Sequence, residues 1–327
     1  AGPRRRILEV ALPLARPAIT AGVALALMET LADYGVGAYF GLTTFSTGIF
    51  KAWLVMNDGV AAAQLASVLL MVVALLLAAE RAAQRRLRFA ASRAGAVHAA
   101  DAQPLPLRGA AAALAFALCA LPVALGFVLP VAWLGWMLWQ EAHNAEFGLP
   151  LARFGQWAWA TLRLAGLSAV LAGSLALVLA FFMRRQGGLG GLSGRLLPAA
   201  ARVLSLGYAV PGAVVAVGIL LPVGWLQQRW PDAPIAATVT GTLFGLVFAY
   251  LSRFSSVALQ SVEAGYARVP LSVDETARML GAGPWRVFVQ LHAPLLRRSA
   301  LAAALLVFVD VMKELPATLV LRPFGSD

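Results

Sequence analysis

The sequence predicts an all-α polytopic membrane protein, and two observations lead to this fold class. Of the 327 residues, 61% are hydrophobic and 13% are charged, whereas a soluble domain has about 45–50% apolar and about 25% charged residues. The apolar excess lies in blocks that approach the roughly 20 residues a helix needs to cross a bilayer. About seven spans are expected, at residues 17–40, 59–79, 109–139, 160–183, 199–226, 235–252 and 299–320.

Two of these spans have distinctive features. Span three is longer than the hydrocarbon core requires, so it is expected to tilt or to extend beyond the bilayer. Span five contains Pro211-Gly212, and a proline inside an apolar helix predicts a kink there.

Arginine residues gather in alternate connections between the spans, and this distribution orients the chain. The connections after spans two, four and six are rich in arginine, and Arg253 opens the last of them. The connections on the other side contain Lys51, Arg153 and Arg229. Because cytoplasmic loops are enriched in lysine and arginine, the arginine-rich side is expected to be cytoplasmic. These loops account for the net charge of +11, so no nucleic-acid partner is expected.

Two stretches of the chain are near-copies separated by 281 positions (282 − 1 = 281). Ala1-Gly2-Pro3 recurs as Ala282-Gly283-Pro284, and Pro13 matches Pro294 at the same offset. In each copy a basic, proline-containing loop leads into an apolar helix. The repeat therefore predicts two homologous halves, each with one such loop on the cytoplasmic side.

The repeat also predicts the domain organisation. Residues 1–80 are expected to be the end of the first half, with a remnant of its loop and two spans. Residues 81–108 are expected to form a cytoplasmic linker, and residues 109–327 the second half, with five spans and a loop at about 270–297. The last span of the second half is expected to be missing, so the chain is expected to be a fragment of a longer protein.

Each repeated helix carries two acids four residues apart. These are Glu29 and Asp33 in the first copy and Asp310 and Glu314 in the second, where Lys313 is adjacent. Residues i and i+4 share a helix face, and charged groups within a membrane face the interior of a helix bundle. In one interpretation the acids line a pathway or gate for a hard cation, which carboxylates suit. In the other they are structural, because Lys313 neutralises Asp310 or Glu314 and Glu29 bonds a neighbouring helix.

The loop at 270–297 is predicted to contain two short helices. Ser272 and Glu275 fit a capping box at the start of the first helix, and Gly281 is placed to end it. A second amphipathic stretch runs from Trp285 to Leu291, ahead of Pro294. A capped helix on an exposed loop suits a groove in a partner protein.

This loop resembles the signature of ATP-binding-cassette (ABC) importer permeases, in which Glu-Ala-Ala, three residues, Gly, nine residues and Ile-x-Leu-Pro follow one another. Glu275, Ala277, Gly281 and Pro294 fall in register, whereas Thr276, Leu291 and Ala293 depart from the pattern. The resemblance implies the type I, MetI-like permease fold and a coupling helix that contacts an ATPase subunit. The coupling residues it implies are Asp274, Glu275, Ala277, Gly281, Gly283 and Pro294, with Gly2 and Pro13 in the other copy.

Other strings resemble the ferric-iron permeases that have two fused halves. They are Ala32-Asp33-Tyr34-Gly35, Lys313-Glu314-Leu315-Pro316 and Gly207-Tyr208-Ala209-Val210-Pro211-Gly212. The resemblance implies a multi-pass permease of the bacterial inner membrane that imports ferric iron by alternating access. Its implied partners are a periplasmic binding protein and a cytoplasmic ABC ATPase dimer that uses ATP and Mg²⁺. Thiamine, polyamine and phosphonate permeases share much of this scaffold, and thiamine or a polyamine is the alternative substrate. An ion-driven secondary transporter, which also has internal repeats and membrane acids, is the alternative of another class.

The sequence contains no catalytic constellation. No Gly-x-x-x-x-Gly-Lys-Ser/Thr phosphate loop is present, so the chain is expected to hydrolyse no ATP and to bind no cofactor itself. His98, His143 and His292 lack the spacing of metal ligands, so no tightly bound metal is expected. His292 is expected at an interface or at the loop surface. Cys119 is the single cysteine, which excludes a disulfide within the chain.

Overall fold

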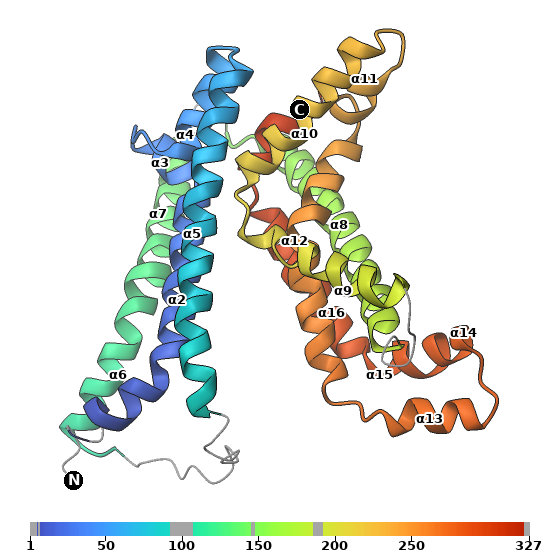
Figure 1. The fold of residues 1–327 in the computed structure, drawn as a ribbon. Coiled ribbons are helices and arrows are strands. Elements are labelled where there is room, and N and C mark those ends of the chain that lie inside the picture. The colour runs from blue at the N-terminus through green and yellow to red at the C-terminus, as the bar shows by residue number, and fades with distance from the viewer. Residues whose placement is uncertain (1–4, 6, 92–106, 145–147, 186–191, 324–327) are drawn as a thin grey trace. The chain divides into compact units, whose positions relative to one another are not determined.

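The computed structural model describes residues 5, 7–91, 107–144, 148–185 and 192–323, and the regular structure of this part is helical throughout (Figure 1). The predicted all-α fold class is therefore confirmed. Most of the linker predicted at 81–108 lies outside the described residues, because residues 92–106 are not among them.

Four unbroken helical stretches are long and apolar enough to cross a membrane, as expected for spans two, three, four and six. The third predicted span is α6, η4 and α7 in direct succession, and it covers 35 residues. At about 1.5 Å per residue it exceeds the thickness of the hydrocarbon core. The crossing stretches are Gly59–Ala82 of α5 (Gly59–Ala91), α6 (Ala110–Val123) with η4 (Ala124–Val128) and α7 (Leu129–Asn144), α8 (Leu151–Arg185), and α12 (Leu243–Tyr266).

Spans one and seven were expected to be continuous, and this expectation is wrong. Helix α2 (Leu12–Ala32) ends before Asp33, and α3 (Gly35–Tyr39) follows. Helix α16 (Arg297–Met312) ends at Lys313, and α17 (Pro316–Leu321) follows. Pro316 lies in the first turn of α17, where its missing N–H costs no helical hydrogen bond. Each break therefore begins a new short helix at a residue suited to a helix start.

The kink predicted in span five is confirmed, and it is sharp. Helix α9 (Leu192–Leu204) and η6 (Gly207–Ala209) form one arm, and α10 (Gly212–Arg229) forms the other. The two arms are bent by 118°. Pro211 is the N-cap of α10, so the proline starts a helix in a new direction.

Span six begins and ends later than expected. The sequence suggested 235–252, but α12 runs to Tyr266, and the preceding α11 (Ile235–Thr240) is a separate short helix. Arg253, which was assigned to the cytoplasmic connection, is inside α12 and only 6% exposed. The sequence alone could not show that this charge has a partner within the helical core.

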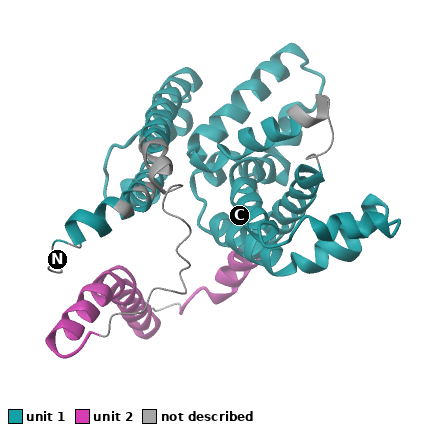
Figure 2. Cartoon of the chain, turned by 60° about the horizontal axis from the view of Figure 1, so that its bottom comes forward, with its two compact units in different colours: residues 1–87, 160–327 teal, residues 88–159 magenta. Residues whose placement is uncertain are grey.

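The described residues divide into two compact units (Figure 2). One comprises residues 1–87 and 160–327, and the other comprises residues 88–159. In the first unit α12 packs along α16. Small side chains on α8 face the same core, which lets helices approach closely. The buried α8 residues include Ala165, Ala169, Ala172, Ala176 and Ala180.

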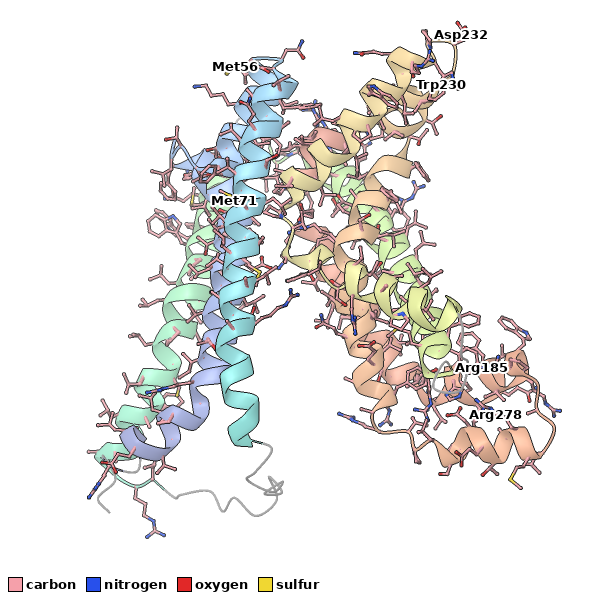
Figure 3. The ribbon with its side chains drawn as sticks, in the orientation of Figure 1. Met56, Met71, Arg185, Trp230, Asp232 and Arg278 are labelled. Atoms are coloured by element: carbon pink, nitrogen blue, oxygen red, sulfur yellow. The ribbon has the colours of Figure 1, made fainter. Side chains whose placement is uncertain are left out.

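A second buried cluster joins elements of the two predicted halves. Ile49 of α4 (Phe45–Phe50), Ala52 of η2 (Lys51–Val55) and Leu69 of α5 pack with Ala213 and Val217 of α10. Leu31 of α2 and Leu319 of α17 pack against its edge. The broken ends of α2 and α16 therefore belong to one packed region. Elsewhere apolar side chains point outward, such as Met71 of α5 (Figure 3), which is 57% exposed and suits a lipid-facing surface.

Candidate functional site at the helix breaks and the loop

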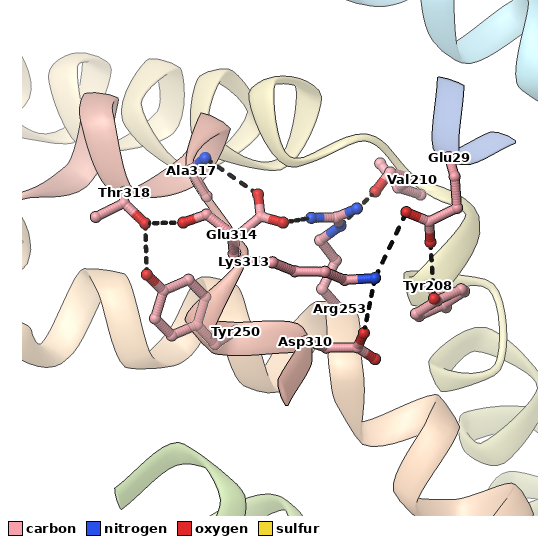
Figure 4. Close-up of polar contacts among 10 residues, drawn as sticks. All are labelled: Glu29, Tyr208, Val210, Tyr250, Arg253, Asp310, Lys313, Glu314, Ala317 and Thr318. Carbon is pink, nitrogen blue, oxygen red and sulfur yellow. Dashed lines mark hydrogen bonds and ion pairs between the residues drawn. The ribbon is translucent and has the colours of Figure 1, made fainter. Parts of the chain in front are cut away.

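A network of charged and polar side chains lies at the three helix breaks (Figure 4). Glu29 comes from α2, Tyr208 from η6 and Arg253 from α12. Asp310 comes from the last turn of α16, and Lys313 and Glu314 from the break that follows it. Four helical elements and the break after α16 therefore supply one network.

Lys313 connects the two copies of the repeat. Its Nζ lies 3.1 Å from Asp310 Oδ1 and 3.7 Å from Glu29 Oε2. Glu29 and Asp310 occupy equivalent positions (310 − 29 = 281). The Tyr208 hydroxyl donates a hydrogen bond to Glu29 Oε1 at 2.7 Å. The expected neutralisation of Asp310 by Lys313 is thus present, and Glu29 bonds a neighbouring element as the structural interpretation required.

Glu314 pairs with Arg253 and not with Lys313. Both side chains of this ion pair are 7% exposed, and Arg253 Nε also donates to the Val210 carbonyl at 2.9 Å. A side chain at Gly212 would overlap the Glu314 carboxylate, so the glycine leaves room for the pair. Arg253 therefore holds α12 to the bend before α10 and to the break before α17.

The expectation that each acid pair shares a helix face is wrong, because each helix ends between its two acids. Asp33 Oδ2 accepts the Val36 N–H at 3.1 Å, and Glu314 Oε1 accepts the Ala317 N–H at 3.2 Å. A carboxylate that accepts an N–H at a helix start satisfies a donor without a helical partner. Glu29 and Asp310 gather at Lys313, and Asp33 and Glu314 start the short helices α3 and α17.

The predicted loop contains the two helices that the sequence suggested. Helix α13 (Ser272–Met279) ends at Gly281, whose φ of 76° lies in the left-handed region that favours glycine. The Gly281 and Ala282 N–H groups bond the carbonyls of Arg278 and Ala277 at 2.9 and 3.0 Å, which is a common glycine helix end. The second stretch is α14 (Pro284–Val287), η7 (Phe288–His292) and α15 (Ala293–Leu295).

The prediction of a capping box at Ser272 is wrong. The N-cap of α13 is Leu271, which makes no side-chain cap hydrogen bond. Ser272 is already the first helical residue, and its carbonyl accepts from the Thr276 hydroxyl at 2.8 Å. Glu275 is an exposed residue of the first turn.

Asp274 fastens the loop to the membrane helices. Its carboxylate accepts hydrogen bonds from Arg184 Nε at 2.7 Å and from His292 Nε2 at 2.5 Å. Arg184, at the end of α8, also donates to the carbonyls of Tyr266 and Pro270 at 3.3 and 2.9 Å. His292 is fully buried, so its expected surface position is wrong. Asp274 thus faces inward, which argues against direct contact with a partner.

The outer side of the loop is apolar and charged. Met279, Leu280 and Trp285 are 89%, 81% and 74% exposed. A cavity of about 220 Å³ between α8 and α13 is lined by Arg184, Arg185, Asp274, Glu275 and Arg278, of which Figure 3 labels Arg185 and Arg278. Such a surface can receive a partner through apolar contact and charge.

The other residues that the resemblance implied are spread over the loop helices and α2. Gly283 is the N-cap of α14, Ala277 is half-buried within α13, and Pro294 is exposed within α15. Pro13 lies in the first turn of α2. Gly2 lies outside the described residues.

Sequence reasoning missed four residues that hold these sites together: Tyr208, Arg253, Arg184 and His292. Arg253 carried a signal, because it is a lone charge inside an apolar stretch. The others had none, because their partners are distant in the sequence. Among the residues that the structure describes, no three His, Cys, Asp or Glu side chains are grouped to hold a metal ion.

The described residues form an all-α chain with several apolar spans and with charged side chains at broken spans, which is the architecture of a polytopic membrane protein. Comparison with known families makes this specific: residues 176–325 match the family described as binding-protein-dependent transport system inner membrane component. The chain is similar to this family over these residues, and it is a multi-pass inner-membrane protein.

The curated relatives cover different shares of the chain. An Fe(3+)-transport system permease of Haemophilus influenzae is 24% identical over 94% of this chain, and the chain spans 58% of that relative. A putative 2-aminoethylphosphonate transport system permease of Salmonella typhimurium is 29% identical over 38% of the chain and 43% of its own length. A molybdenum transport system permease of Azotobacter vinelandii is 29% identical over 49% of the chain and 70% of its own length.

Proposed function

We propose that the chain is the membrane-embedded part of an ATP-driven importer that moves ferric iron from a periplasmic binding protein to the cytoplasm by alternating access. In this proposal residues 1–80 end one permease half, residues 81–108 link the halves, and residues 109–327 belong to the second half. The equivalent helix breaks at Asp33 and Glu314 support this division. Alternating access is a two-state change that bound partners bias.

The observation that carries the substrate class is the charge of the network at the helix breaks. In the network that Figure 4 draws, three carboxylates stand against two cationic side chains, and Asp33 at the break after α2 adds a fourth carboxylate (−4 + 2 = −2). An excess of negative charge in a membrane attracts a cation and repels an anion, and carboxylate oxygens suit a hard cation. The carboxylates are those of Glu29, Asp33, Asp310 and Glu314, and the cations are Arg253 and Lys313.

The similarity to a ferric permease over most of the chain supports iron within this class. Relatives whose names refer to a phosphonate or to molybdenum match smaller parts of the chain. A phosphonate is an anion and would meet the two excess negative charges. Thiamine and polyamines are cations, so the charge of the network does not distinguish them from iron. Measuring the uptake of each substrate distinguishes them.

The partner proposed for the loop is the cytoplasmic ATPase dimer, which would use ATP and Mg²⁺ while this chain binds no cofactor. The exposed Met279, Leu280 and Trp285 form a surface that fits a groove in that subunit. The ion pair of Asp274 and Arg184 holds the loop to α8. A movement of the loop is therefore transmitted to this span. An ion-driven secondary transporter is the rival class, and it requires no such docking surface.

Uptake of labelled ferric iron by cells tests the proposal. The cells express the full-length permease with its ATPase and binding protein, and thiamine and spermidine are measured in parallel. The double variant Glu275→Ala/Gly281→Val is expected to abolish iron uptake, because the valine is strained at a positive φ. Arg268→Gln, an exposed residue ahead of the loop, is the matched control and is expected to retain it.

Uptake of thiamine or spermidine without iron uptake would contradict the iron assignment. Iron uptake that persists in the double variant, at normal membrane levels, would contradict coupling through this loop and favour the ion-driven class.

A further inference from the structure

We propose that the Lys313 ammonium group acts as a tethered cation that closes the space between the two repeats. A cationic substrate displaces this ammonium group as it passes. This inference deepens the proposed function and rests on it, because it names the residue that sets the sign of the transported charge.

The repeat gives the first argument. Glu29 and Asp310 are equivalent residues of the two copies, and one ammonium group lies between their carboxylates, 3.7 and 3.1 Å away. The position equivalent to Lys313 in the first copy is occupied by Ala32 (313 − 281 = 32). A single lysine therefore serves two carboxylates, one from each repeat, and its charge is the direct link between them.

Exposure gives the second argument, because it separates this interaction from the neighbouring ion pair. The Lys313 and Glu29 side chains are 55% and 44% exposed, whereas Arg253 and Glu314 are both 7% exposed. An ion pair with exposed side chains exchanges partners more readily than a buried one, because breaking a buried pair is strongly unfavourable. Lys313 is therefore the exchangeable contact, and Arg253 with Glu314 is the fixed one.

The chemistry of the contacts gives the third argument. The attraction between charges scales with their product, so a trivalent cation competes strongly with a lysine ammonium for the same carboxylates. The carboxylate and Tyr208 oxygens nearby are hard ligands, of the kind that hard cations take. An anion gains nothing by approaching the carboxylates and cannot release the lysine. Passage by exchange with Lys313 thus selects for positive charge.

A different role for Lys313 is local and structural. It lies at the C-terminal end of α16, where a positive charge stabilises the helix dipole. Arginine would preserve both roles, and methionine would remove both, so these two variants alone do not separate them. A chemical rescue that restores the charge after folding does.

The test uses the full-length permease, purified and inserted into vesicles that contain a chelator whose terbium complex is luminescent. Terbium is the probe because it is a hard trivalent cation, and no ATPase is present. The Lys313→Met variant is expected to admit terbium about fivefold faster than the unmodified protein, the population change that about 1 kcal/mol produces. The Lys313→Arg variant is expected to remain closed.

The rescue uses Lys313→Cys in a Cys119→Ala background, because Cys119 is the single cysteine of this sequence and is exposed. Modification with an aminoethyl thiosulfonate restores an ammonium at position 313 and is expected to close the leak. Modification with the sulfonatoethyl reagent adds a negative charge and is expected to leave it open. Equal effects of the two reagents, or no leak in a correctly inserted Lys313→Met protein, would overturn the proposal.

The outcome is separable from that of the proposed function. A leak that the aminoethyl group closes, without iron uptake by the complete transporter, would uphold the gate and refute the iron assignment. Iron uptake by the complete transporter together with no leak in any variant would uphold the function and refute the gate.

Discussion

Asp33 and Glu314 lie 281 residues apart (314 − 33 = 281) and have the same local role. Each carboxylate accepts a hydrogen bond from the backbone N–H three residues later, at the start of a short helix. Val36 and Ala317, the donors, are also equivalent in the repeat. The two copies therefore share a structural device as well as a sequence. Their other contacts differ, because Glu314 alone is neutralised by a buried arginine.

The Asp33 cap predicts a specific pattern of stability. Asp33→Ala is expected to lower the free energy of unfolding by about 1 kcal/mol, the usual effect of losing a helix cap. Asp33→Asn keeps an acceptor and is expected to lose less than half of that. Thermal unfolding of the purified protein in detergent, followed by tryptophan fluorescence, measures both. Equal losses for alanine and asparagine would contradict a capping role.

The buried pair of Arg253 and Glu314 predicts a large loss when one partner is removed. Arg253→Met leaves an unpaired buried carboxylate and is expected to cost about 3–5 kcal/mol. In Arg253→Met/Glu314→Gln the glutamine is neutral and can still accept the Ala317 N–H, so most of the loss is expected to be recovered. Chemical unfolding of both variants tests this. If the double variant is as unstable as Arg253→Met, the unpaired carboxylate of Glu314 is not the cause of the lost stability.

Gly212 predicts a contrast between two glycines of α10. Gly212→Ala is expected to destabilise the protein and to weaken the Arg253 contact, because its Cβ would overlap the Glu314 carboxylate. Gly218→Ala, with nothing within 4 Å of the added Cβ, is the matched control. It is expected to be neutral or to stabilise by about 0.5–1 kcal/mol, since alanine favours helix. The unfolding midpoints of the two variants test this contrast. Equal midpoints would contradict the close approach of Gly212 to the Glu314 carboxylate.

The inward and outward faces of α13 predict different sensitivities to protease. Asp274→Ala removes the acceptor of Arg184 and His292 and is expected to cost about 1–3 kcal/mol locally. Trypsin is expected to cleave the loop at Arg278 or Arg286 about 5- to 150-fold faster in this variant, because the opening equilibrium shifts by about that energy. The neighbouring Glu275→Ala removes an exposed carboxylate and should leave cleavage unchanged. Faster cleavage in both variants would show that Asp274 has no special anchoring role.

The long helices could be predicted from the sequence because apolar length alone defines a membrane span. The breaks at Asp33 and Glu314 could not, because an average over apolar residues does not reveal a carboxylate that caps a new helix. Arg253 was misplaced for a related reason. Its partner Glu314 is 61 positions away, and without that partner an arginine beside an apolar run is more simply assigned to a loop.

The loop was located from its sequence pattern, but the directions of its side chains were not. Asp274 and Glu275 are adjacent, and the pattern assigned both to the partner surface. Asp274 turns inward because Arg184, 90 positions away, meets it at the end of α8. Only the packed structure brings these two residues together.

The central claim is that ATP-driven import of a cation passes through this chain. Its most direct test is uptake of labelled ferric iron by vesicles that contain the full-length permease with its ATPase, supplied with the periplasmic binding protein. Uptake is expected to require ATP on the ATPase side, to fail with Glu275→Ala/Gly281→Val, and to be unaffected by 2-aminoethylphosphonate. Uptake that proceeds without ATP, or no iron uptake from a correctly inserted complex, would contradict the claim.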